Sequence, residues 1–142
     1  MSFKRRKGLF ELLIKNVKII GENEITDGFV RTANGKITEV GKTAREAENE
    51  EVIDGNGKYL SPGFIDLHVH GGGGYSAMGT PEDIVKMATA HMNYGTTSIL
   101  PTTLAAPIAQ LKTALLNIKD AKRICKTVNI IGAHLEGTSA EL

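Results

Sequence analysis

The sequence predicts an α/β fold, in which a small β-rich module precedes a parallel sheet with crossover helices. The pair Asn34-Gly35 separates two apolar-rich runs, which is typical of a β-hairpin. Beyond Pro62, apolar runs alternate with two segments of helical periodicity. A β-α-β-α-β order of this kind implies parallel strands with right-handed crossovers. The 142 residues suffice for one ordinary core, or for two small modules that share one.

The β-rich module is expected over residues 12–61. Strands are predicted at 13–20, 29–32 and 37–40, where β-branched residues are enriched. Asn34-Gly35 suits a type I′ turn, because both central residues of that turn need a positive φ. Residues 44–51 are charged and rich in alanine and predict a loop or one helical turn. Residues 52–60 predict a strand, a turn at 55–57 and another strand, so the whole module is expected to be antiparallel.

The second part of the chain is expected to alternate strands with helices. Its strands are predicted at 64–70, 96–100 and 128–135. The mostly apolar first strand is expected to be covered on both faces. The sequence predicts only three such strands, whereas a complete (β/α)₈ barrel has about eight strands and about 250 residues. The pattern therefore allows either a small open α/β unit or the opening portion of a barrel.

The two predicted helices have clear boundaries. The first begins at Thr80, since threonine is a favourable N-cap, and Pro81 and two acids suit the first turn. It is followed by Gly95, and its inner positions recur at helical spacing at Ile84, Met87, Ala88 and His91. The second helix is predicted at 108–125. Its apolar face is expected to contain Leu111, Leu115, Ile118 and Ile124.

The composition argues against several classes of partner. The chain has 17 basic and 16 acidic residues and a net charge of +1, which gives no reason to expect nucleic acid or a membrane as partner. The cluster Lys4-Arg5-Arg6-Lys7 is expected to belong to a disordered basic tail, residues 1–11. No run approaches a membrane span, and no secretory leader is recognisable. The single cysteine, Cys125, is interpreted as a packed or free thiol, and these features together predict a cytoplasmic protein.

Two histidines at the end of the first parallel strand are the main chemical signal. His68 and His70 are two residues apart, so a strand aims both imidazoles to the same side. The four glycines 71–74 follow and would let backbone approach a ligand closely. Because α/β folds place their chemistry at the carboxyl ends of strands, metal binding is favoured over a structural role. Asp66 shares their face, and it either orients an imidazole or caps the loop network.

Further candidates end the other two strands. Glu136 lies two residues after His134, and a carboxylate beside two imidazoles is a donor set suited to zinc or a similar divalent ion. His134 itself is interpreted as structural, and so is His91 within the first helix. Thr102 and Thr103 follow the second strand. Hydroxyls at such a junction usually cap the next helix, and that role is favoured over contact with a ligand.

Longer motifs around these residues resemble a known enzyme family. Ser61-Pro62-Gly63-Phe64-Ile65-Asp66-Leu67-His68-Val69-His70 resembles the first-strand signature of the amidohydrolase superfamily. Three further segments look like N-acetylglucosamine-6-phosphate deacetylase, and they are the glycines 71–74, GTTSILPTT at 95–103 and GAHLEG at 132–137. The resemblance covers roughly residues 12–137. Dihydroorotase-like relatives share the His-X-His strand but usually rely on a later lysine instead of a glutamate on the third strand.

The resemblance implies a fold, an activity and a metal site. It implies that residues 62–142 are the N-terminal portion, with the first three strands, of a metal-dependent (β/α)₈ (TIM) barrel, preceded by part of a small β-sandwich module at 12–61. The implied reaction is deacetylation of N-acetylglucosamine 6-phosphate to glucosamine 6-phosphate and acetate, in amino-sugar catabolism. His68, His70 and Glu136 match metal-binding positions, for zinc or iron, and the ion would activate water and polarise the amide carbonyl. Full-length members are expected to be homo-oligomers.

The sequence also departs from the family pattern. The family continues after the glutamate and glycine with Pro-Phe, where this chain has Thr-Ser-Ala-Glu-Leu at 138–142. Ser76 and Ala77 stand where acidic or larger residues are common. The further metal histidines, the phosphate-binding groups and the aspartate expected as general base have no counterpart. The chain alone is therefore expected to be incomplete and inactive, with an uncovered apolar edge.

Two alternatives stay open. The first is another metal-dependent amidohydrolase, which acts on a cyclic amide or on a different acyl amino sugar. The second is a non-catalytic fragment that folds only with a partner.

Overall fold

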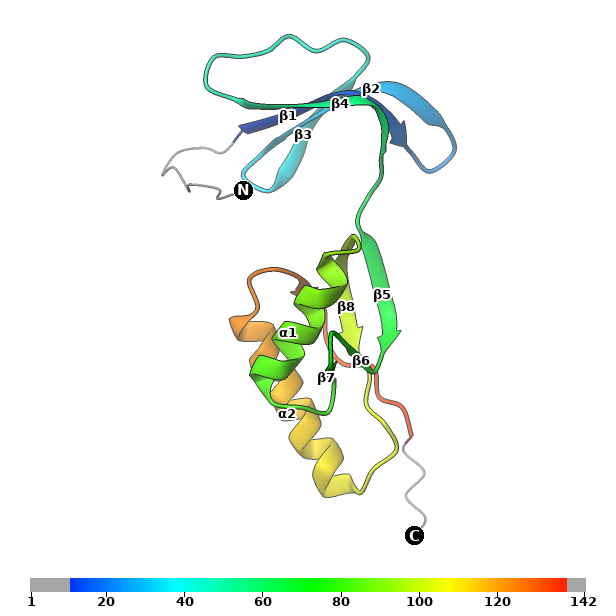
Figure 1. Ribbon diagram of the computed structural model, residues 1–142, viewed down its shortest axis with the longest axis vertical. Helices are drawn as coiled ribbons and strands as arrows, with labels where there is room; N and C mark the ends of the chain where they lie inside the picture. Colours follow the sequence, from blue (N-terminus) through cyan, green and yellow to red (C-terminus); the bar gives the residue numbers. More distant parts are fainter. Residues whose placement is uncertain (1–10, 138–142) are drawn as a thin grey trace. The chain divides into compact units, whose positions relative to one another are not determined.

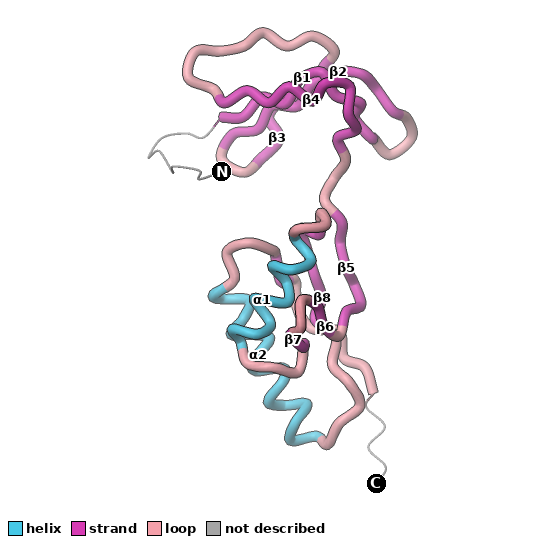
Figure 2. Tube along the Cα trace, in the orientation of Figure 1, coloured by secondary structure: helices cyan, strands magenta, loops and turns pink. Residues whose placement is uncertain are grey.

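The structure, a computed structural model, describes residues 11–137. Residues 1–10 of the predicted basic tail, with its Lys4–Lys7 cluster, and residues 138–142 lie outside the described residues, whereas Glu11, the last residue of that predicted tail, begins a strand. The chain divides between Pro62 and Gly63 into two compact units. All regular structure described in the first unit is strand, and both described helices belong to the second (Figure 2). The predicted α/β class with a strand-rich first part is thereby confirmed. Within residues 11–137, no helix combines the length and the apolar character needed to cross a membrane.

The first unit is a four-stranded sheet in the order β3-β2-β1-β4 (Figure 1). The strands are β1 (Glu11–Ile20), β2 (Ile25–Ala33), β3 (Lys36–Gly41) and β4 (Glu51–Leu60). β2 is antiparallel to both β1 and β3. The turn between β2 and β3 confirms the prediction, because Asn34 and Gly35 have φ values of 54° and 74°. The buried apolar residues of this unit are Leu13, Val17, Phe29 and Val30.

The predicted strand-turn-strand over residues 52–60 is wrong, and so is the all-antiparallel module. β4 is one strand, which pairs in parallel with β1 on both sides of an irregularity. Residues 55–57 form a bulge there, and Asn56 has a φ of 50°. The Asp54 carboxylate accepts hydrogen bonds from the Asn56 N–H (2.9 Å) and from the Asn16 side-chain amide (2.8 Å). Because β1 offers backbone partners before and after the bulge, strand pairing outweighs the local turn signal.

The segment between β3 and β4 is a loop, one of the two predicted alternatives, and Arg31 holds it. The Arg31 guanidinium pairs with Glu39 and with Glu50 (Nε to Oε2, 2.9 Å). It also donates to the Arg45 carbonyl at 2.6 Å. The Ala47 N–H donates to the Glu50 carboxylate at 2.6 Å. The Arg31 hydrogen bond, together with that from Ala47, lowers the pKa of Glu50.

We expect the first unit to lose stability in acid. Folding lowers the pKa of Glu50, and it lowers the pKa of Asp54 mainly through the Asn56 N–H. A carboxylate whose pKa falls on folding stabilises the native state at pH values above its unfolded pKa, about 4. That contribution is lost as the pH drops from about 4 through the lower folded-state pKa. Amide NMR signals of β2 and β3, followed during acid titration, measure the loss.

The matched control for this prediction is Glu50→Gln. Its neutral amide cannot titrate, so the stability of the variant should fall less steeply between neutral pH and the acid range than that of the wild type. If the stability of Glu50→Gln depended on pH as steeply as that of the wild type, other groups would be the cause of the acid sensitivity.

The second unit contains a three-stranded parallel sheet in the order β5-β8-β9. Its elements are β5 (Phe64–Val69), a short hairpin of β6 (Gly71–Gly72) and β7 (Tyr75–Ser76), α1 (Pro81–Met92), β8 (Thr96–Pro101), α2 (Ile108–Ile124) and β9 (Asn129–Ile130). α1 packs against α2, β8 and the β6–β7 hairpin, and α2 also contacts β9 (Figure 1). Residues from both helices and from all three strands of the sheet form one core.

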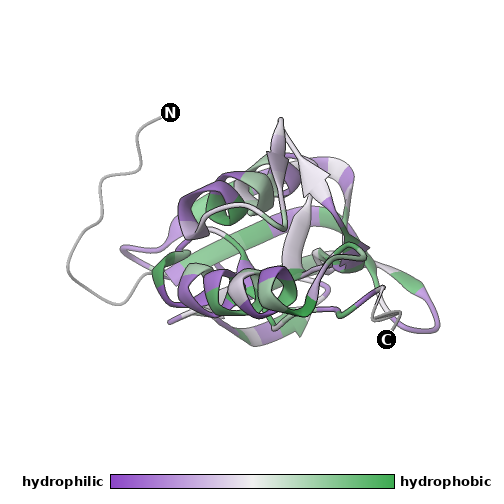
Figure 3. Ribbon diagram, turned by 90° about the horizontal axis from the view of Figure 1, so that it is seen from below, coloured by the Kyte–Doolittle hydropathy of each residue, from purple (hydrophilic) through white to green (hydrophobic). Residues whose placement is uncertain are grey.

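The first helix begins as predicted. The Thr80 hydroxyl accepts a hydrogen bond from the Asp83 N–H, and the Asp83 carboxylate accepts one from the Thr80 N–H. Pro81 occupies the first helical position. Ile84, Met87 and Ala88 are fully buried, as their spacing predicts. Both helices carry hydrophobic and hydrophilic stripes along their length (Figure 3).

The apolar face of α2 differs from the prediction. Its buried residues are Leu111, Ala114, Ile118 and Ala121. Leu115 and Ile124 are instead exposed, at 37% and 48%. The small alanines let α2 approach its neighbours closely, so the covered stripe is narrow and leaves these two larger side chains at its flanks.

The expectation that the 64–70 strand is covered on both faces is wrong. Phe64, Ile65 and Leu67 are 64%, 61% and 57% exposed. Among the described residues, β5 is an edge strand that pairs only with β8, and only Val69 of β5 joins the core. The uncovered apolar edge that the sequence predicts is therefore present.

The third predicted strand, 128–135, is also shorter than expected, since β9 contains only Asn129 and Ile130. Beyond β9 the chain still follows β8. The Ile131 N–H donates to the Ile99 carbonyl and the His134 N–H to the Pro101 carbonyl, both at 3.0 Å. These two donors are three residues apart, so the segment follows β8 without forming a continuous ladder, and no described strand pairs with its other side.

Candidate metal site

Three predicted side chains meet at the carboxyl edge of the parallel sheet. The ligand atoms of His68, His70 and Glu136 all lie within 4.8 Å of one another. His68 Nε2 is 2.7 Å and His70 Nε2 is 3.2 Å from the same Glu136 carboxylate oxygen. The two Nε2 atoms are 3.1 Å apart. Two imidazole nitrogens and a carboxylate oxygen are a donor set that could hold a zinc-like divalent ion.

The fold explains how these side chains meet. His68 lies in β5 and His70 directly after it, so the two-residue period of the strand aims both rings to one side. Glu136 comes from the segment that follows the bridge between Thr102 and His134. The three side chains are 50%, 38% and 48% exposed, so small molecules have access to them.

Hydrogen bonds to backbone carbonyls place the proton on two of the rings. His70 Nδ1 lies 3.2 Å from the Thr102 carbonyl oxygen. A carbonyl only accepts, so the His70 Nδ1 carries a proton and donates it to this oxygen, which leaves Nε2 as the ring atom that faces the cluster. His134 likewise donates from Nδ1 to the Leu67 carbonyl at 2.8 Å. The Thr102 carbonyl thus orients the His70 ring so that Nε2, the atom that could bind a metal, lies toward His68 and Glu136.

Thr102 and Thr103 do not cap the next helix, so that prediction is wrong. α2 begins at Ile108, with Pro107 as its N-cap residue. Both threonine side chains are fully buried; Thr102 is hydrogen-bonded instead to β5, and Thr103 to the segment after β9 that contains Glu136. Sequence reasoning missed this role. Two adjacent hydroxyl residues at the same sheet edge as the histidines were the only signal for it.

Four other residues singled out in the sequence have structural roles or none in the cluster. The Asp66 carboxylate accepts a hydrogen bond from the His68 backbone N–H at 3.1 Å, which fits the loop cap of its two predicted roles. The His134 ring lies 4.7 Å from that of His68, edge to face, outside the three-residue cluster. His91 Nε2 is 3.1 Å from the Gly71 carbonyl and so ties α1 to the hairpin. Cys125 is a free thiol, with Sγ 3.6 Å from a threonine hydroxyl.

The four glycines after His70 shape a hairpin. Gly73 and Gly74 form its turn, with φ values of 59° and 85°. A Cβ atom on Gly72 would lie 2.4 Å from His91 Nε2, so a larger residue there would push the hairpin off α1. The close contacts of these glycines in the structure are with α1 and within the hairpin, and the predicted approach to a ligand stays a prediction.

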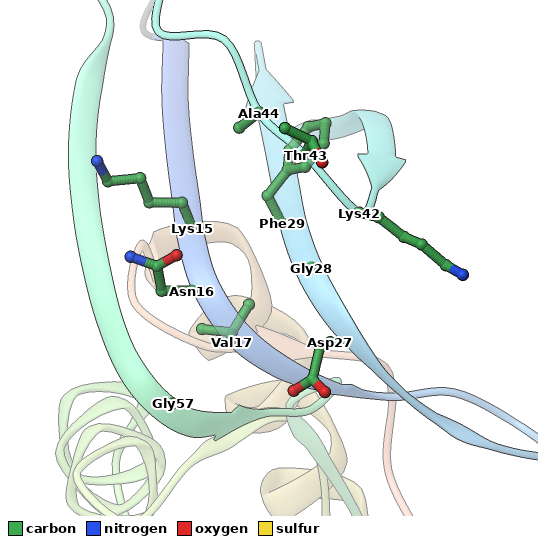
Figure 4. Close-up of a pocket in the computed structure, with 10 residues that line it drawn as sticks. All are labelled: Lys15, Asn16, Val17, Asp27, Gly28, Phe29, Lys42, Thr43, Ala44 and Gly57. Atoms are coloured by element: carbon green, nitrogen blue, oxygen red, sulfur yellow. The ribbon is translucent and has the colours of Figure 1, made fainter.

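A pocket of about 450 Å³ lies in the first unit, separate from the His/Glu cluster (Figure 4). It lies beside the β1 irregularity at Asn16 and the loop that follows β3, and Lys15, Asp27 and Lys42 contribute charged groups to it. These groups form no cluster of metal-ligand type in the described part of the chain. The chemistry therefore points to the end of β5.

The chain is similar to known enzymes over most of its length. It is 33% identical over 133 residues to the N-acetylglucosamine-6-phosphate deacetylase of Bacillus subtilis (strain 168). The aligned region covers 89% of this chain and 34% of that protein. It is 32% identical over 118 residues to the N-acetylgalactosamine-6-phosphate deacetylase of Escherichia coli O157:H7, covering 82% of this chain and 30% of that protein. No protein-family model matches the chain.

A solved structure gives the same result. The crystal structure of N-acetylglucosamine-6-phosphate deacetylase from Pasteurella multocida matches 89% of this chain and 34% of its own chain, with a TM-score of 0.73 and 29% identity. The chain thus spans about a third of the length of the relatives that it matches. By sequence and by structure, the chain is similar to N-acetylglucosamine-6-phosphate deacetylases, of whose length it spans about a third.

Proposed function

We propose that the chain forms part of a metal-dependent hydrolase that removes the acetyl group of N-acetylglucosamine 6-phosphate, giving glucosamine 6-phosphate and acetate. The observation that carries the proposal is the cluster of His68, His70 and Glu136 in a chain whose relatives bear this name. N-acetylgalactosamine 6-phosphate is the second candidate substrate, because a relative of nearly equal identity is named for it.

We further propose that β5, β8 and β9 are the first three strands of a (β/α)₈ barrel. Their parallel order supports this, as does the exposed apolar surface of β5, which a neighbouring strand and helix would cover. Residues 12–61 would then be part of a β-sandwich module and residues 62–142 the opening portion of the barrel. Relatives of about three times the matched length leave room for the remaining strands.

In this proposal His68 and His70 bind a metal through Nε2, and Glu136 binds it through a carboxylate oxygen. A bound divalent ion, zinc or iron, would lower the pKa of a water molecule and polarise the amide carbonyl. The hydrogen bond from His70 Nδ1 orients the ring so that Nε2 could bind the ion, and the negative charge of Glu136 would compensate part of the charge of the ion. The resemblance assigns proton transfer to an aspartate without a counterpart in this sequence.

Acetate release tests the proposal. The protein is expressed both as residues 1–142 and with any coding sequence that follows, loaded with zinc or iron, and incubated with each sugar phosphate. We expect acetate from N-acetylglucosamine 6-phosphate with the longer protein, and none with residues 1–142 alone. Treatment with a chelator should abolish the activity.

Other outcomes would replace the proposal. Hydrolysis of a cyclic amide, with no release of acetate from either sugar phosphate, would identify a different amidohydrolase. Absence of both metal binding and turnover would favour a non-catalytic fragment. A well-behaved monomer of residues 1–142 with a cooperative melt would contradict the incomplete barrel.

A further inference from the structure

The segment that contains Glu136 has few sheet hydrogen bonds of its own. β9 ends at Ile130, and beyond it the only described bridge to β8 is that between Thr102 and His134. Glu136 therefore needs another anchor if its carboxylate is to stay beside the two imidazoles. A half-exposed glutamate on a free loop would otherwise sample many positions.

Thr103 provides that anchor. Its hydroxyl accepts a hydrogen bond from the Glu136 N–H at 3.0 Å and donates one to the Glu136 carbonyl at 3.1 Å. Its own N–H donates to the His134 carbonyl at 3.0 Å. The Thr103 side chain is fully buried, so these bonds are shielded from water. Three hydrogen bonds from one residue thus hold the backbone around Glu136.

Thr102 makes the corresponding connections to β5. Its hydroxyl accepts a hydrogen bond from the Val69 N–H at 2.8 Å, and its N–H donates to the Val69 carbonyl at 2.8 Å. Its carbonyl accepts from His70 Nδ1 at 3.2 Å, which sets the ring orientation and the tautomer. Thr102 therefore orients His70 on one side of β8, while Thr103 fixes Glu136 on the other.

We propose that Thr102-Thr103 is the positioning element of the metal site, through which the end of β8 sets the distance between His70 and Glu136. This inference rests on the proposed function, since it presumes that the His/Glu cluster binds a divalent ion. Neither threonine contacts the ion in this proposal. They determine the separation of the ligands before the ion arrives, and such prior ordering increases the affinity of a site.

The test is a titration with Co²⁺, whose visible absorption reports its ligands, followed by competition with Zn²⁺. Thr103→Val keeps the branched shape but removes both hydroxyl hydrogen bonds to Glu136. We expect its affinity for either ion to fall about 10- to 100-fold, with an altered Co²⁺ spectrum, because groups that orient ligands have effects of that size. Thr103→Ser keeps the hydroxyl and should restore both the affinity and the spectrum.

The matched control is Thr113→Val in α2. The Thr113 hydroxyl also donates to a backbone carbonyl, that of Ala109 at 3.0 Å, but the residue is exposed and lies away from the cluster. This variant should bind both ions like the wild type. Circular dichroism confirms the folding of each variant. If Thr103→Val does not fold, Thr103→Ala, which also removes both hydroxyl hydrogen bonds and adds no metal ligand, takes its place with the same expectation.

Two outcomes are distinguishable. Wild-type affinity and spectrum in a folded Thr103→Val or Thr103→Ala would overturn the positioning role and leave the metal site intact. Absence of ion binding by the wild type would instead overturn the metal site, and the positioning role with it.

Discussion

Glu136→Gln should lose divalent-metal binding almost completely. The substitution keeps the shape of the side chain but removes the negative charge at the oxygen that lies within 3.2 Å of both Nε2 atoms. A neutral amide is a poor ligand for zinc, so we expect a loss of affinity larger than the about 10- to 100-fold cost of removing a group that only orients a ligand. Isothermal titration with Zn²⁺ measures the change.

Thermal unfolding of Glu136→Gln gives a second test, because zinc should change the melting temperature of the wild type and not that of the variant. An ion that binds only the native state raises the free energy of unfolding by about 2.7 kcal/mol when its free concentration is about 100 times its dissociation constant. In the longer protein used for the acetate-release test, the wild type should therefore melt at a higher temperature when zinc is added, and Glu136→Gln should not. Without zinc the two should melt alike, since the Glu136 side chain is half exposed and surface ion pairs contribute little.

The matched control for this prediction is Glu48→Gln, an exposed glutamate in the loop before β4. It should bind zinc like the wild type and show the same thermal shift. Equal zinc affinity in Glu136→Gln and Glu48→Gln would mean that Glu136 is not a ligand.

Ile99→Ala should destabilise the second unit by about 2–5 kcal/mol, the usual cost of truncating a buried isoleucine to alanine. Ile99 is fully buried in the middle of β8, where it pairs with Asp66 of β5 and Ile130 of β9. It belongs to the core that joins both helices to the sheet. The cavity left by its removal would lie at the centre of that core. Urea unfolding followed by circular dichroism measures the loss.

In residues 1–142 alone, Ile65→Ala is the control for Ile99→Ala, because it removes the same atoms from a parallel strand at a position that is 61% exposed. Substitutions at exposed sites usually change stability by no more than about 0.5 kcal/mol. A cost for Ile65→Ala as large as that for Ile99→Ala would show that something covers the face of β5 in solution.

The features that sequence predicted well are those decided by neighbouring residues. The N-cap at Thr80 needs only its own hydroxyl and the N–H of Asp83, three residues on. The β2–β3 turn needs only two residues that tolerate a positive φ, Asn34 and Gly35. The common direction of His68 and His70 follows from strand geometry alone.

The errors occur where a distant segment competes with a local signal. The sequence around Asn56 is typical of a turn, but β1 binds the chain before and after it, so a bulge forms within a parallel strand. The burial of Leu115 and Ile124 depended on which side of α2 meets α1, and periodicity does not specify that. The exposure of Ile65 and Leu67 depends on what pairs with β5, which composition does not reveal.

The sequence by itself determined the α/β class, the strand that carries His68 and His70, and the resemblance to a deacetylase family, because short-range patterns encode all three. Only the tertiary structure decided that Glu136, 66 residues after His70, lies 3.2 Å from it. It also showed that buried threonines at the end of β8 connect the two ligand segments. Such contacts depend on strand order and register, which arise from packing over the whole unit and not from the residues next to each ligand.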